Sequence, residues 1–431
     1  MEKMDWKTHN TINDNIQALM QIFPDAFSEG KVDYEKLQLL LGENIIDDKE
    51  KYSFTWKGKN DAIKVALAQN TWTLRPDKKS SKNWDTTQNL YLEWDNLEVL
   101  RTLQDSYRGK VKMIYIDPPY NTGNDYFIYP DNYWESIDNY KQKTEQDMKS
   151  NPDTSGRFHS DWLSMMYPRL KLARNLLKND WVIFISIWDD EFWNLKKICD
   201  EIFWEENFLS DIIWNSTKSV TNTAIISWSH THNLVYFKSM DYFTLNRNEF
   251  RLLEDWEGFN NPDNDTRWPW KADPFQVWGW RPNQQYEIKN PNTWEIYKPN
   301  TNCSWKNDYE NFQNLLKDNR IVFWKTWEAW PQRKRFKSEA LSRWKVAKTL
   351  WNNIETTTLW DDVETTTNWT QLLKNLFDNK YLFDNPKPIW LIERMLQLGT
   401  NSDSIILDFF SWSATTAHAI MKLNNDEIEY E

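Results

Sequence analysis

Residues 111–120 read VKMIYIDPPY, an apolar run that ends in an aspartate, two prolines and a tyrosine. Residues 182–187, VIFISI, are apolar at almost every position. Such continuous runs are typical of strands buried on both faces, as in a parallel sheet. Between them, residues 161–177 place apolar side chains at helical spacing. Strand, helix and strand in this order predict an α/β doubly wound sheet.

The same alternation continues on both sides of this stretch. We expect strands at 89–92, 211–214 and 233–237, a helix at 195–203, a second helix at 389–398 and a strand at 404–408. The intervening region, 241–375, is polar, rich in Asn, Pro and Thr, and lacks sustained periodicity. The sequence therefore predicts four segments: a mostly helical, charged extension (1–80), an α/β part (81–240), an insertion (241–375) and a second α/β part (376–431).

Charge and composition exclude some classes of protein. The formal net charge of -12 is not that of an overall basic nucleic-acid binder, although one local stripe can still contact phosphates. The longest apolar run, 181–188, is far shorter than the roughly 20 residues that span a bilayer. The first ten residues are polar and charged, so we expect no secretory signal, and Cys199 and Cys303 are far apart. We expect a cytoplasmic protein with no membrane partner.

Tryptophan and glycine occur in abnormal numbers. The chain has 29 Trp and 9 Gly, whereas average usage would give roughly 30 Gly. Trp294 and Trp369 stand in polar turn sequences, and Trp181 stands where a helix is expected to end. We interpret these as UGA codons that the source cell reads as glycine; the alternative is a Trp-rich protein. Four tryptophans have contexts that suit the indole: Trp162, Trp214, Trp270 and Trp351.

The strongest chemical signal is the loop Asp117–Tyr120, directly after the 111–116 strand. An exocyclic amine of a nucleobase is a weak nucleophile because its lone pair is delocalised into the ring. The Asp117 carboxylate and the Pro118 carbonyl can accept its two N–H bonds, while Pro119 keeps the loop rigid. The Tyr120 ring can stack on a base that has left the duplex. An ordinary structural turn remains the alternative.

A second signal is LDFFSWSATTA at residues 407–417. A strand that ends in a turn of small residues before a helix is a common arrangement for binding nucleotide-like cofactors. As written the turn has no glycine, and an ordinary strand–helix turn is the alternative. With glycine at Trp412 it becomes a tight turn that a ligand can approach closely.

Together these stretches resemble the adenine-N6 DNA methyltransferases of the permuted class, in which the catalytic motif precedes the cofactor motif. The nearest match is with the modification subunits of type III restriction-modification systems. The resemblance covers nearly the whole chain, in LEWDNLEVL (92–100), MIYIDPPYNTG (113–123), WLSMMYPRL (162–170), PKP (386–388) and the 407–417 turn. It implies a circularly permuted, Rossmann-like methyltransferase fold with the target recognition domain at 241–375. The parts at 81–240 and 376–431 would be catalytic and cofactor-binding, respectively.

The resemblance also assigns residues. Asp117, Pro118, Pro119 and Tyr120 would form the catalytic loop. S-adenosylmethionine would be held by Asp95 near its adenosine part, Lys387 near its polar groups, and Asp408, Phe409, Phe410, Ser411, Ser413 and Thr415 around its methionine part. The family transfers the methyl group in line, without a covalent enzyme intermediate. The implied partners are double-stranded DNA, a restriction subunit with helicase and nuclease activities, and a second copy of the chain.

This sequence departs from the family pattern in two ways. The family has glycine at the positions of Trp94, Trp181 and Trp412, and an indole at 412 should weaken cofactor binding. Family members also continue into a further strand beyond the position of Glu431, so the cofactor part reads as truncated. Two other functions stay open: cytosine-N4 methylation, whose enzymes more often have serine at position 117, and DNA recognition without catalysis.

Two further groups of side chains could bind DNA or a metal ion. Residues 313–350 hold ten Lys or Arg against three acidic residues, centred on Arg333, Lys334 and Arg335. Because this stretch lies in the expected target recognition domain, we expect these three residues to contact DNA phosphates. His230 and His232 would share a face of an extended strand, but the chain has five His and no nearby Cys, so we expect no metal site.

Overall fold

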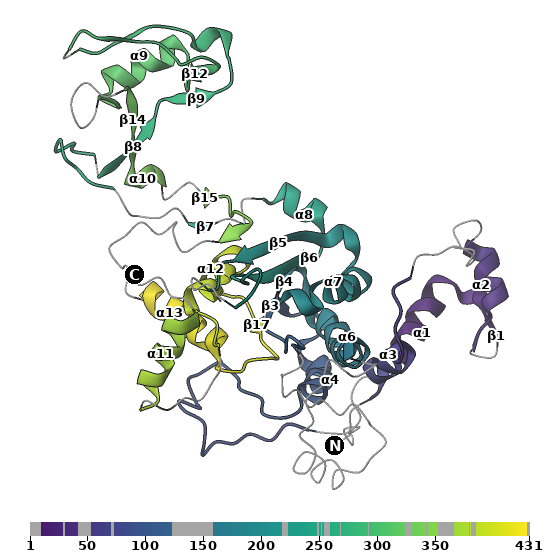
Figure 1. Cartoon of the computed structure of the whole chain (residues 1–431). Helices are drawn as coiled ribbons and strands as arrows, with labels where there is room; N and C mark the ends of the chain where they lie inside the picture. Colours follow the sequence, from purple (N-terminus) through teal and green to yellow (C-terminus); the bar gives the residue numbers. More distant parts are fainter. Residues whose placement is uncertain are drawn as a thin grey trace. The chain divides into compact units, whose positions relative to one another are not determined.

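The computed structural model forms two compact units, one inserted in the sequence of the other (Figure 1). The first unit comprises residues 1–250, 348–354 and 362–431, and the second comprises 251–347 and 355–361. Within them the structure describes residues 10–28, 31–41, 53–69, 73–122, 158–217, 223–247, 250, 252–253, 259–267, 269–291, 293–323, 330–340, 344–351, 366–378, 380 and 385–428.

The first unit is built on a six-stranded sheet in the order β16-β5-β6-β4-β3-β17 (Figure 1). Its strands are β3 (Val111–Ile116), β4 (Leu177–Ile187), β5 (Phe208–Trp214), β6 (Thr231–Phe237), β16 (Leu350–Trp351) and β17 (Ile406–Leu407). β17, β3 and β4 run parallel to one another, whereas β6 is antiparallel to β4 and β5. The predicted Rossmann-like α/β fold is confirmed. Its permuted order is visible in β17, which comes late in the sequence and pairs with β3.

Helices cover both faces of this sheet because its central strands are apolar on both sides. Ile183 and Ile185 of β4 belong to the core that contains α4 (Asn96–Tyr107), α6 (Phe158–Leu176) and α7 (Asp189–Phe203). The opposite face of β4 meets α12 (Ile389–Gly399), where a Cβ on Gly399 would come within 2.6 Å of Val182. α12 packs in turn against α13 (Thr415–Ile428). The predicted helices at 161–177, 195–203 and 389–398 are therefore confirmed.

The remaining elements lie outside the central sheet. In the first unit they are α1 (Thr11–Ile22), η1 (Pro24–Ala26), β1 (Phe27–Ser28), β2 (Lys31–Val32), α2 (Tyr34–Leu41), α3 (Lys59–Leu67), η2 (Glu205–Asn207), α8 (Met240–Leu245) and α11 (Thr366–Leu376). In the second unit they are β7 (Leu252–Leu253), β8 (Trp270–Pro274), β9 (Gln276–Trp278), η3 (Pro282–Gln284), β10 (Ile288–Lys289), β11 (Ile296–Tyr297), β12 (Cys303–Trp305), α9 (Tyr309–Lys317), β13 (Ile321–Val322), β14 (Gln332–Phe336), α10 (Lys337–Ala340) and β15 (Trp344–Lys345). Among the described residues, no helix is long and apolar enough to cross a membrane.

Three local predictions are wrong. Residues 89–92 form no strand but an irregular segment that leads into α4. Trp369 lies inside α11 and is 2% exposed, so it is not in a solvated turn. Trp181 lies within β4 and is 3% exposed, because the strand begins at Leu177, directly after α6, and leaves no glycine-type helix end at 181. At 181 and 369 the backbone gives no reason to expect glycine.

Other tryptophans support the glycine hypothesis. Trp204, Trp294 and Trp412 have φ values of 72°, 65° and 38°, in the left-handed region that a bulky side chain rarely adopts. The rings of Trp294 and Trp412 are 70% and 55% exposed, so burial does not offset this strain. In contrast, the four tryptophans expected to be genuine are nearly fully buried: Trp162, Trp214, Trp270 and Trp351.

Candidate active site

The loop 117–120 follows β3 at the carboxyl edge of the parallel strands and is held by side chains from three directions. Tyr120 donates its hydroxyl hydrogen to Asp117 Oδ1 at 2.6 Å. Lys387 Nζ donates to Asp117 Oδ2 at 2.7 Å and also to the Tyr120 hydroxyl. On the other side, Trp162 Nε1 donates to the Pro119 carbonyl at 2.7 Å. The carboxylate predicted to be catalytic therefore lies in a preorganised polar cluster.

The second predicted motif meets this loop in space because β17 pairs with β3. β17 ends just before Asp408, whose Oδ1 accepts the Phe410 N–H at 2.9 Å and whose Oδ2 accepts the Thr416 hydroxyl at 2.6 Å. These bonds close the 408–415 turn around a carboxylate at the start of α13. The turn and the 117–120 loop thus lie at the ends of adjacent parallel strands, where ligands bind in open α/β sheets.

The Asp408 carboxyl has an unusual protonation equilibrium. Burial raises its pKa to about 7, and the nearby Asp117 carboxylate acts in the same direction, while the hydrogen bonds from Thr416 and Phe410 oppose the shift. The group therefore carries a full negative charge only when pH rises above neutrality or when a cation approaches. A carboxyl in this condition favours a positively charged ligand group.

The other residues predicted for the cofactor divide into two kinds. Phe409 and Phe410 are 8% and 5% exposed and pack in the hydrophobic core, so only their backbone can face a ligand. Ser411 and Ser413 are partly exposed, and the Ser413 and Thr415 hydroxyl oxygens lie 3.0 Å apart. The structure therefore brings these residues together in one turn with Asp408.

Asp95 and Lys387, predicted to contact the cofactor, both make hydrogen bonds within the protein. Asp95 is the N-cap of α4: its Oδ1 accepts the Leu97 and Glu98 N–H groups at 3.1 and 3.2 Å. Lys387 directs its ammonium group to Asp117 and Tyr120, and its backbone carbonyl accepts the Thr415 hydroxyl at 3.3 Å. Lys387 therefore joins the 408–415 turn to the 117–120 loop.

Trp412 also joins the two motifs. Its indole Nε1 donates to the backbone carbonyl of Asp117 at 2.6 Å. The indole thus reaches from the 408–415 turn to the 117–120 loop, across the space between the two predicted motifs. A cofactor that approached the backbone of the turn would have to displace it.

A series of hydrogen bonds beneath the site was not predicted from the sequence. Arg169 of α6 donates from Nε to Asn96 Oδ1 at 2.6 Å, and Asn96 Nδ2 donates to the Phe409 carbonyl at 2.8 Å. This chain fixes the 408–415 turn to α4 and α6. Arg169 is fully buried, and a charged residue inside an otherwise apolar helical face was the available signal.

A second buried network crosses the sheet under the 117–120 loop. The hydroxyl oxygens of Tyr115 and Ser186 lie 3.1 Å apart, and Ser186 donates to Asn233 Oδ1 at 2.7 Å. Asn233 Nδ2 in turn donates to the Ile212 carbonyl at 3.0 Å. The three side chains come from β3, β4 and β6. Ser186, the polar residue within the 182–187 run, was the signal for this network.

The basic residues expected to contact DNA lie on β14 of the second unit. For Lys334 this prediction is wrong. Lys334 is fully buried and pairs with Asp263 and with Asp265, whose Oδ2 lies 2.9 Å from its Nζ. Because its charge is already neutralised inside the unit, Lys334 does not face phosphate. Arg335 Nε lies 3.7 Å from Asp273 Oδ2, and Arg333 is partly exposed. Residues 324–329 and 341–343 of the same basic stretch lie outside the described residues.

The fold, together with the two motifs that meet at the ends of β3 and β17, indicates the class of protein. The family model described as DNA methylase matches residues 111–431, and the chain belongs to that family. It is 33% identical to the type III restriction-modification enzyme StyLTI Mod subunit of Salmonella typhimurium over 94% of this chain and 61% of that protein. It is 32% identical to the EcoPI Mod subunit of Escherichia phage P1 over 96% of this chain and 68% of that protein.

A type II enzyme is also similar. The chain is 30% identical to the methyltransferase M.KpnI of Klebsiella pneumoniae, over 79% of this chain and 78% of that protein. The similarity to the two Mod subunits confirms the predicted resemblance to type III modification subunits. The chain spans about two thirds of the length of these two proteins.

Proposed function

We propose that this chain is a DNA methyltransferase that transfers a methyl group from S-adenosylmethionine to N6 of an adenine. The observation that carries the proposal is the meeting of Asp117 with the 408–415 turn at the ends of the paired strands β3 and β17. The proposal also rests on membership of the DNA methylase family and on the similarity to Mod subunits.

The residues at the two motifs fit the cofactor when residue 412 is glycine. Asp408 is a partly exposed carboxyl whose pKa is raised by its surroundings, and the ammonium group of the methionine part would restore its charge. The Ser411 and Ser413 side chains line the same turn. The Trp412 indole does not fit, because it occupies the approach to the turn. When bound, S-adenosylmethionine supplies a methyl group on a positively charged sulfur.

The chain's own contribution is orientation and hydrogen bonding. The Asp117 carboxylate and the Pro118 carbonyl accept the two N6–H bonds of a flipped adenine, which directs the amine lone pair out of the ring plane. Tyr120 offers its ring face to the base. Lys387 and Tyr120 hold the Asp117 carboxylate in a single orientation before the base arrives. Orientation of the reacting groups is the protein's main contribution, and no covalent enzyme intermediate is needed.

The decisive experiment follows labelled methyl transfer from S-adenosylmethionine to unmethylated DNA. The enzyme carries Trp412→Gly, and the control carries Asp117→Ala in addition. We expect label in N6-methyladenine with the first protein and none with the second. Label in N4-methylcytosine would overturn the assignment of the base. Retained cofactor and DNA binding without transfer would support DNA recognition without catalysis.

The proposal extends to partners. Residues 251–347 form a separate unit with its own core, and we assign it to recognition of double-stranded DNA, with Arg333 and Arg335 as phosphate contacts. Because the chain resembles Mod subunits of restriction-modification enzymes, it would also bind a restriction subunit. A second copy of the chain is a further predicted partner. Light scattering after size-exclusion chromatography tests the homodimer: a monomeric mass across the micromolar range would refute it.

A further inference from the structure

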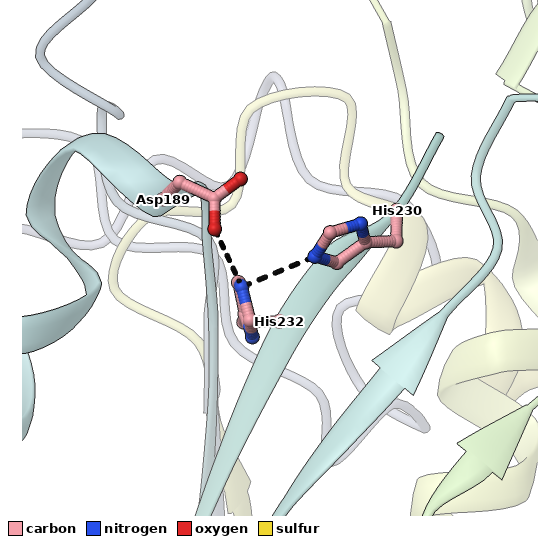
Figure 2. Close-up of side chains that lie close together, drawn as sticks. All are labelled: Asp189, His230 and His232. Atoms are coloured by element: carbon pink, nitrogen blue, oxygen red, sulfur yellow. Dashed lines mark hydrogen bonds and ion pairs between the residues drawn. The ribbon is translucent and has the colours of Figure 1, made fainter. Parts of the chain in front are cut away.

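Three side chains at one edge of the sheet lie with their donor atoms close together (Figure 2). His230 precedes β6 and His232 is its second residue. Asp189 is the first residue of α7, which begins one residue after the end of β4. Their nearest ligand-type atoms all lie within 4.8 Å of one another. The sequence placed the two histidines on one face of a strand but predicted no metal site, and the third side chain comes from an element distant in sequence. β6 is antiparallel to β4, and its first residues therefore lie beside the end of β4.

Two of the three distances between the donor atoms are close to those around a small cation. His230 Nε2 lies 3.3 Å from His232 Nε2, and His232 Nε2 lies 3.0 Å from Asp189 Oδ1. A tetrahedral zinc ion with bonds of about 2.0–2.1 Å holds its ligand atoms about 3.3 Å apart. Two imidazole nitrogens separated by this distance gain little from each other, since one of them has to donate for a hydrogen bond to form. A shared cation would satisfy both.

The orientation of His232 is fixed by a fourth residue. Its Nδ1 lies 2.6 Å from Asp211 Oδ2 of β5, and its ring packs against Phe192 at a centroid distance of 4.3 Å. With Nδ1 donating to Asp211, a bound ion would take the Nε2 lone pair in place of the proton that Nε2 otherwise donates to Asp189. A carboxylate that bonds the outer nitrogen of a ligand histidine is the usual support of protein zinc sites.

We propose that Asp189, His230 and His232 bind a divalent transition-metal ion, with zinc as the best fit, and that Asp211 orients His232 for this purpose. Three protein ligands leave the fourth position to water. The side chain of Asp189 is 52% exposed, so the site is open to solvent. The ion would tie the start of α7 to the start of β6. Methyl transfer requires no metal, and the proposal is independent of the proposed function.

The test is titration of zinc alone into the full chain after removal of metals with a chelator and dialysis. Isothermal calorimetry should report one zinc ion per chain. His230→Ala and Asp189→Asn should each weaken zinc binding at least tenfold. The matched controls His418→Ala and Asp190→Asn make the same chemical changes outside the cluster and should leave affinity unchanged.

Asp211→Asn separates the proposal from a simple pair of surface histidines. It leaves all three ligands in place, so we expect a loss of zinc affinity of about 10–100-fold only if Asp211 orients His232. Cobalt in place of zinc should give the visible absorption of a tetrahedral site, and His230→Ala should abolish it. The absence of stoichiometric binding, or equal affinity in His230→Ala and His418→Ala, would overturn the proposal.

Discussion

Replacing Trp412 by glycine should convert the chain from a form that binds S-adenosylmethionine weakly to one that binds it well. Trp412 has φ 38° and donates its indole N–H to the Asp117 carbonyl. A non-glycine residue in the left-handed region costs about 1–2 kcal/mol, and the lost hydrogen bond is worth about 1 kcal/mol. These effects oppose each other, so Trp412→Gly should change the free energy of unfolding by less than about 1 kcal/mol.

The effect on the cofactor should be much larger. In the Trp412 chain the ligand has to break the indole hydrogen bond and displace a bulky ring from the turn, which costs more than about 1.4 kcal/mol, or a tenfold factor in affinity. We therefore expect Trp412→Gly to lower the Kd for S-adenosylmethionine at least tenfold, as measured by isothermal calorimetry.

A matched control exists in the second unit. Trp294 also has positive φ and an exposed ring, so Trp294→Gly relieves the same backbone strain at a position with no role in the cofactor site. It should leave the Kd unchanged. Equal affinity for S-adenosylmethionine in Trp412→Gly and Trp294→Gly would refute the reasoning that the indole obstructs the turn.

Three other predictions follow from single observations. Lys334→Met should lower the free energy of unfolding by about 3 kcal/mol in denaturant titration, because it leaves the Asp263 and Asp265 carboxylates without their buried cation; no change would contradict the internal ion pair. Because the pKa of Asp408 is raised to about 7, the folded chain keeps a proton that the unfolded chain releases, so stability should fall as pH rises from about 4 to 7, by roughly 2–4 kcal/mol. Asp408→Asn should remove that fall in pH-dependent melting. Peptide mass spectrometry of the protein from its source cell should show glycine at 204; tryptophan there would contradict the codon hypothesis.

The sequence predicts the centre of the fold well because local and long-range signals agree there. The 182–187 run is apolar on both faces, and only a strand covered by helices on both sides buries it. Asp117 could be placed at the carboxyl edge of the sheet for the same reason, since it directly follows a buried strand. In contrast, no residue in the sequence marks the boundary between α6 and β4. Trp181 was therefore predicted to lie at the end of a helix, although it lies within the strand.

Residue partners could not be predicted where they depend on strand register or on distant chain segments. Lys334 reads as part of a basic run, and only the pairing of β14 with β8 reveals that its side chain points into the unit towards Asp263 and Asp265. Asp189 joins the histidine pair through the antiparallel packing of β6 on β4. Asp95 directly precedes a helix, and its capping role could have been predicted from that position, whereas its contact with the cofactor stays a prediction.

Lys387 joins the 117–120 loop to the 408–415 turn, because it contacts each of them through different atoms. Its ammonium group pairs with Asp117, while its backbone carbonyl accepts the Thr415 hydroxyl of the 408–415 turn. The hydrogen bond from Thr415 thus anchors the backbone of the residue whose ammonium group holds Asp117. A single residue therefore holds the Asp117 carboxylate and fastens the start of α13 to the 386–388 segment.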